Sequence, residues 1–147
     1  MAAAYCLELK GKDYKATALV KEYYLESWGV TEGELWETAL ENLRKEEYGI
    51  KPLSEILESM LGPRMGSFHD FPFLYVLTTQ RVSHGAAGIL RKDLLEEFSK
   101  LARGNFYILP SSVHETLLLV DGPGIKAEDL RDTLWWMNAG VIISPIR

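Results

Sequence analysis

The residue types of a nucleophile, a base and an orienting acid occur together in one short segment. Ser111 and Ser112 are closely followed by His114 and Glu115, and these are the groups that a serine hydrolase combines. On an extended strand, however, Ser112 and His114 lie on one face roughly 6 to 7 Å apart, while Glu115 lies on the other. Neither serine stands in a G-x-S-x-G elbow. We therefore expect these side chains to satisfy backbone groups at a strand entrance, and catalysis is the weaker interpretation.

Two further groups of polar residues stand in predicted loops. Arg81 and His84 belong to the link TQRVSHG, and His69 and Asp70 belong to the loop GPRMGSFHDFP. If the link and the segment PSSVHE lie at the same end of a sheet, Arg81 and His84 add donors for an anionic group. The sequence thus predicts a ligand site whose candidate residues are Arg81, His84, Ser111, Ser112, His114 and Glu115.

The sequence predicts neither a metal nor a cofactor. The three histidines and Cys6 lack the short spacings that zinc sites show. The loop DGPG lacks the long glycine pattern and the following lysine of a phosphate-binding loop. Cys6 has no neighbouring His or Arg that would activate its thiol, and we expect it to be a small core residue of a central strand.

Composition limits the class of protein. The 147 residues, 47% of them hydrophobic, suit one domain over residues 1–147. Sixteen basic and twenty-one acidic side chains are scattered along the chain, which disfavours nucleic acid as a partner because phosphate binding needs a clustered basic face. No apolar run is long enough to cross a membrane. A single cysteine and the absence of a secretion signal at the start favour the cytoplasm.

The chain begins with a predicted hairpin. Ala2–Leu9 and Ala16–Val20 are short, apolar and separated by the polar stretch GKDY, so we expect them to pair. The aromatic segment that follows is predicted to be a short helical turn or an irregular cover that ends at Gly29.

A long helix is predicted next. Thr31 and Glu34 have the spacing of a capping box, in which each side chain binds the other residue's free backbone N–H. Gly49 is predicted to end this helix after Tyr48. The apolar face consists of Leu35, Trp36, Ala39, Leu40 and Leu43.

The middle of the chain is predicted to contain a short helix and a second hairpin. Pro52 suits the first turn of the helix, and Gly62 and Pro63 end it. Phe73–Thr78 is rich in β-forming residues, and we expect Ala86–Leu90 to be its antiparallel partner.

The last part is predicted to contain a helix, two strands and a final helix. Asp93 and Glu96 form a second capping box, and Gly104 closes that helix. FYILP and TLLLV then indicate two strands. The stripe predicted to be buried on the first helix consists of Leu94, Leu95, Phe98, Leu101 and Ala102, and the final helix presents Leu130, Leu134 and Met137.

Strands therefore arrive in pairs with helices between them. The order β-β-α-α-β-β-α-β-β-α predicts an α+β fold with a mainly antiparallel sheet, on which the helices pack.

Several stretches together resemble a known family. FYILPSSVHE follows HGAAGIL and a capped helix, and AAYCLEL, WGVTEGELWETALENL and YVLTTQRVSHGAAGIL complete the set. This set is similar to an uncharacterised clostridial and Firmicutes family classed as a domain of unknown function. The resemblance implies no activity. Similar proteins carry a helical segment before AAYCLEL and an acidic tail after the position of Asn138, which this sequence lacks.

Two classes of function follow. The preferred one is a non-catalytic binding or interaction domain, and the alternative is a small hydrolase-like enzyme that uses His114 with Ser111 or Ser112. We further expect a homodimer, because a chain without the flanking segments of its relatives leaves apolar surface uncovered. The expected contact consists of Trp135, Trp136 and the tail from Val141 to Ile146.

Overall fold

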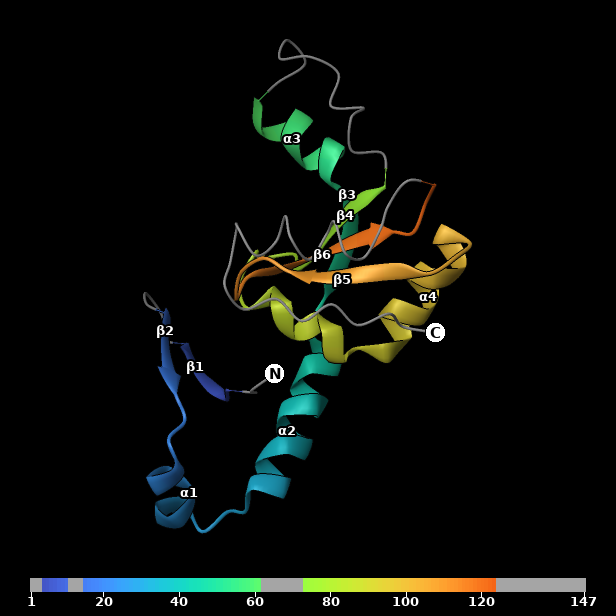
Figure 1. The fold of residues 1–147 in the computed structure, drawn as a ribbon. Coiled ribbons are helices and arrows are strands. Elements are labelled where there is room, and N and C mark those ends of the chain that lie inside the picture. The colour runs from blue at the N-terminus through green and yellow to red at the C-terminus, as the bar shows by residue number, and fades with distance from the viewer. Residues whose placement is uncertain (1–3, 11–14, 62–72, 124–147) are drawn as a thin grey trace. The chain divides into compact units, whose positions relative to one another are not determined.

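A computed structural model describes residues 4–10, 15–61 and 73–123 of the chain. The chain divides into two compact units, residues 1–45 and 46–147, and each is described by itself. The described elements are helices and antiparallel sheets of two and four strands (Figure 1), so the α+β class is confirmed. No helix within the described ranges combines the length and the apolar character that crossing a membrane requires.

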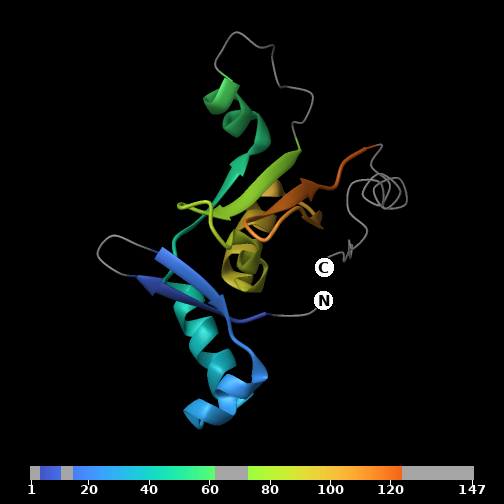
Figure 2. The same cartoon turned by 90° about the vertical axis from the view of Figure 1, so that its left-hand side faces the viewer.

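The first unit opens with the predicted hairpin. Strands β1 (Cys6–Lys10) and β2 (Lys15–Leu19) run side by side and antiparallel (Figure 2), with Cys6 opposite Leu19. The expectation that Cys6 is a core residue is wrong. Its side chain is exposed, and β1 belongs to a two-stranded sheet, so it is not a central strand.

Two helices follow the hairpin. Helix α1 (Glu22–Trp28) ends at Gly29, whose φ of 67° is the left-handed conformation that glycine adopts without strain. Helix α2 (Glu32–Lys45) begins with the predicted capping box. The Thr31 N–H donates to Glu34 Oε2 at 2.8 Å, and the Glu34 N–H donates to Thr31 Oγ1 at 3.2 Å. The Thr31 N–H, together with the Thr31 hydroxyl that donates to Glu34 Oε2 at 2.8 Å, lowers the pKa of the Glu34 carboxyl.

The prediction that the long helix continues to Tyr48 is wrong. Helix α2 ends at Lys45, and residues Tyr48–Pro52 form strand β3, which is antiparallel to strand β4 (Leu74–Thr79). Tyr48 and Ile50 pack against the core of the second unit, so burial across the sheet outweighs the local helical pattern. Helix α3 (Leu53–Leu61) begins directly after Pro52, close to where it was expected.

The second unit is a four-stranded antiparallel sheet in the order β3-β4-β6-β5. Strands β5 (Phe106–Pro110) and β6 (Glu115–Val120) confirm the strands expected for FYILP and TLLLV. Helix α4 (Lys92–Ala102) packs on one face of this sheet (Figure 1). The core there consists of Leu77, Leu95, Phe98, Phe106, Leu118 and Val120.

The predicted partner strand Ala86–Leu90 does not exist. Residues Gly85–Leu90 form a 3-10 helix, η1, and strand β4 pairs with β3 and β6 instead. Two glycines explain this packing, because a Cβ at Gly88 would lie 2.7 Å from the Tyr48 ring and one at Gly85 would meet the Thr78 side chain at 2.6 Å. The segment therefore approaches the sheet through glycine instead of extending it.

Helix α4 is confirmed, but its predicted capping box is wrong. The N-cap is Arg91 and makes no side-chain cap bond. The Asp93 carboxylate instead accepts hydrogen bonds from the Arg91 guanidinium, the shortest at 2.6 Å, which lowers the pKa of Asp93 to about 2. Leu101, expected in the buried stripe, is 76% exposed.

Several predicted features lie outside the described residues. These are the loop with His69 and Asp70, the Gly62–Pro63 helix end, the final helix, and the proposed contact of Trp135, Trp136 and residues 141–146.

Candidate functional site

Two connections of the second unit lie at the same end of its sheet, which is the condition on which the predicted anion site depends. Thr78, near the end of β4, is opposite Glu115, the first residue of β6. The link that follows β4 and the turn that precedes β6 are therefore neighbours. The Thr78 hydroxyl joins them by donating to the His114 carbonyl oxygen at 2.7 Å.

Backbone hydrogen bonds at Gly85 and Ala86 also join the two connections. The Gly85 N–H donates to the His114 carbonyl at 3.1 Å, and the Ala86 N–H donates to the Val113 carbonyl at 3.3 Å. Gly85 is buried, and a Cβ at this position would collide with the His114 carbonyl oxygen. A side chain at residue 85 would therefore force the two connections apart.

The two histidines predicted as ligand residues meet at this junction. Their ring centroids lie 5.7 Å apart with an interplanar angle of 69°. The backbone N–H of His84 donates to His114 Nδ1 at 3.2 Å. Because Nδ1 accepts this bond, the neutral His114 ring carries its hydrogen on Nε2. His84 Nδ1 itself lies 3.0 Å from the Ser83 hydroxyl.

The link that carries Arg81 and His84 has an unusual backbone. Val82 and His84 have φ values of 52° and 53°, and the left-handed region is rare for a β-branched residue such as valine. Thr79 holds the turn: its hydroxyl accepts from the Ser83 N–H at 3.1 Å and donates to the Ser83 carbonyl at 3.0 Å. Backbone of this kind persists where surrounding contacts impose it, often at functional sites.

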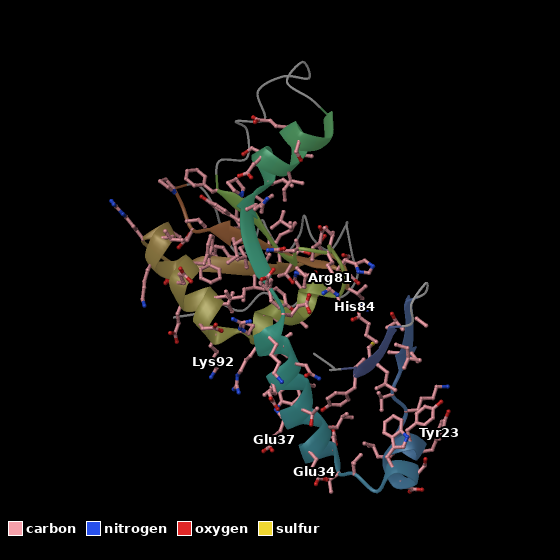
Figure 3. The ribbon with its side chains drawn as sticks, turned by 180° about the vertical axis from the view of Figure 1, so that it is seen from behind. Tyr23, Glu34, Glu37, Arg81, His84 and Lys92 are labelled. Atoms are coloured by element: carbon pink, nitrogen blue, oxygen red, sulfur yellow. The ribbon has the colours of Figure 1, made fainter. Side chains whose placement is uncertain are left out.

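Arg81 lies in the same exposed link as His84 (Figure 3). Within the part of the chain that the structure describes, its guanidinium makes no hydrogen bond or ion pair. The donors of Arg81 therefore stay available to a ligand.

Each of the two serines has a hydrogen-bond partner other than the imidazole of His114. The Ser111 hydroxyl donates to Glu115 Oε1 at 3.0 Å, and Ser112 Oγ accepts from the backbone N–H of His114 at 3.1 Å. The His114 Nδ1 atom is already engaged by the His84 N–H. The expected backbone role is thus observed for Ser112 and for His114, and the Ser111 hydroxyl donates to a carboxylate, not to the imidazole.

Sequence reasoning missed the residues that hold the site together, namely Thr78, Thr79, Ser83 and Gly85. The dipeptide His-Gly at the end of a polar link was the one available signal, because glycine there permits close backbone approach. The described residues contain no group of three or more His, Cys, Asp or Glu side chains placed to hold a metal ion.

Comparison with known proteins identifies a family. A family model described as a family of unknown function (DUF5688) matches residues 1–142. None of the curated proteins and none of the solved structures matches the chain.

Proposed function

The chain belongs to the DUF5688 family of unknown function, and we propose from its own geometry that it is a non-catalytic binding domain. Its recognition site is the pair of connections formed by residues 80–85 and 111–115. We call this pair the histidine junction.

One observation carries the proposal. His84 and His114, thirty positions apart in sequence, are joined through the His84 N–H and His114 Nδ1 at 3.2 Å. The junction combines this contact with left-handed backbone at Val82 and His84 and with a glycine that cannot be enlarged. A rigid frame that holds exposed polar side chains at a sheet end suits recognition.

The hydrolase alternative, with His114 and Ser111 or Ser112, has less support. A general base must lie within hydrogen-bond reach of its nucleophile. In the described residues both serine hydroxyls are engaged elsewhere, one with Glu115 and one with the His114 backbone.

Arg81→Ala and His114→Ala, made in the full chain, test the proposal. The probes are inorganic phosphate, acetate and tetramethylammonium, and the readouts are the melting temperature and the side-chain NMR signals of both histidines. We expect at least one probe to shift these signals saturably, and both variants to stay folded and to lose the effect. Lys100→Ala, which removes an exposed cation from α4, is the matched control.

A lowered melting temperature for His114→Ala, with probe binding intact in the folded fraction, would show that His114 is structural. The homodimer through Trp135, Trp136 and residues 141–146 stays a separate proposal, because it rests on the sequence alone.

A further inference from the structure

Several acceptor atoms around His114 are used within the protein. His114 Nδ1 accepts from the His84 N–H, and the His114 carbonyl accepts from Thr78 and Gly85. Ser112 Oγ accepts from the His114 N–H.

The carboxylate of Glu115, the only acidic residue in the two connections, also accepts a hydrogen bond from within the protein. Glu115 Oε1 accepts from the Ser111 hydroxyl at 3.0 Å. Its negative charge opposes an anionic ligand, and the positive charge of Arg81 offsets it. The Ser83 carbonyl, in the bend of the link, accepts from the Thr79 hydroxyl.

The exposed side chains of Arg81, His84 and His114 offer donors to a ligand. Because His114 Nδ1 is an acceptor, its neutral ring carries the hydrogen on Nε2. Arg81 contributes a planar guanidinium with five N–H groups. When the Ser83 hydroxyl donates to His84 Nδ1, the His84 ring presents its Nε2–H as well.

The donors of Arg81, His84 and His114 come from two connections of the chain. Such a set suits a ligand whose acceptor oxygens point in several directions. A carboxylate has two oxygens in one plane, which a single guanidinium satisfies, whereas a tetrahedral phosphate also has oxygens for the imidazole donors. We propose that the histidine junction binds a phosphate-type oxyanion, with Arg81 and His114 Nε2–H donating to its oxygens. This inference rests on the proposed function and adds the class of ligand.

The experiment uses the full chain with isotope-labelled histidine and arginine side chains. Inorganic phosphate and phosphoserine are the two phosphate probes, and acetate and tetramethylammonium are the comparison probes, all at equal ionic strength. We expect phosphate to shift the His84, His114 and Arg81 signals saturably and more tightly than acetate. A stronger effect of phosphoserine than of inorganic phosphate would identify a phosphomonoester as the natural form, and the reverse order would identify the free ion.

Arg81→Ala should weaken phosphate binding by about tenfold or more, because a charge-assisted hydrogen bond is lost. Lys100→Ala should leave it unchanged. Equal weakening by both variants would overturn the proposal, since it would indicate a general charge effect.

The outcomes distinguish a failure of the phosphate class from a failure of the proposed binding function. Saturable shifts from acetate or tetramethylammonium, with none from either phosphate probe, would refute the phosphate class and leave the binding function standing. The absence of a shift at His84, His114 and Arg81 with every probe would contradict both proposals.

Discussion

The two units of the chain are stabilised in different ways. The second unit has a core in which Leu77 and Leu118 are completely inaccessible to solvent. In the first unit, none of the described side chains at positions 4–9 and 16–45 is buried. Its apolar contacts involve partly exposed side chains. In one of them the rings of Tyr5 and Trp36 pack edge to face, with their centroids 6.3 Å apart.

The order of the two units has different origins. The first unit depends on local devices: the capping box at Thr31, the left-handed Gly29, and the ion pair between Glu41 and Lys45 at 2.7 Å. The second depends on strands that are distant in sequence. Local devices contribute a few tenths to about 2 kcal/mol each, whereas a buried leucine contributes several.

Core truncation should give the largest contrast between the units. Leu77→Ala should lower the free energy of unfolding by about 2–5 kcal/mol, because it leaves a cavity in a fully buried site. Leu40→Ala, at a half-buried position of α2, should cost less than half as much. Urea unfolding of the full chain measures both, and equal costs would show that the first unit also has a core.

Replacing a glycine with alanine should change the free energy of unfolding in opposite directions in the two units. Gly85→Ala should destabilise by about 1–3 kcal/mol, because its Cβ would collide with backbone and with Thr78. Gly33→Ala, in the open first turn of α2, should stabilise by about 0.5–1 kcal/mol through helix propensity. Thermal unfolding checks both variants. A stable Gly85→Ala protein with unchanged His84 and His114 signals would contradict the close contact at the junction.

The capping box gives a smaller effect, confined to the first unit. Thr31→Ala removes the acceptor of the Glu34 N–H and should cost about 0.5–2 kcal/mol of stability in α2. The control is Thr38→Ala within the same helix, whose hydroxyl bonds the Glu34 carbonyl without capping a helix end. Amide exchange along α2 distinguishes them, and similar protection in both variants would argue against the cap.

The smallest effect concerns the ion pair that replaces a cap in the second unit. Arg91 lowers the pKa of Asp93 from 3.8 to about 2, so the pair stabilises fully above about pH 4 and is lost as the pH falls through 2. Since the Asp93 side chain is 64% exposed, its contribution should stay below about 1 kcal/mol. Unfolding of the parent and of Asp93→Asn between pH 2 and 5 tests this, and parallel pH profiles would contradict it.

The same comparison explains what the sequence predicts well. The hairpin of the first unit and the cap at Thr31 depend on residues close in sequence, and both are confirmed. Strand β3 and helix η1 were missed because distant contacts decide them, namely pairing of Tyr48–Pro52 with β4 and packing of Gly85 and Gly88 against the sheet.

In the candidate site, too, the features that depend on distant contacts were not predicted. The sequence left open whether the connections carrying His84 and His114 lie at the same end of the sheet, because it predicted Ala86–Leu90 and not β6 as the partner of β4. The bond from His84 N–H to His114 Nδ1 was not predictable, because it depends on left-handed backbone at Val82 and His84. A valine in a sequence does not indicate left-handed backbone, because a β-branched residue rarely adopts it.

The decisive measurement for the histidine junction is the tautomer of His114. A long-range proton–nitrogen NMR spectrum of the full chain, recorded where the ring is neutral, reports which ring nitrogen carries the hydrogen. The histidine junction predicts hydrogen on Nε2 and an Nδ1 signal typical of a hydrogen-bond acceptor. Hydrogen on Nδ1 would contradict the account, because the ring could then neither accept from the His84 N–H nor present Nε2–H to an anion.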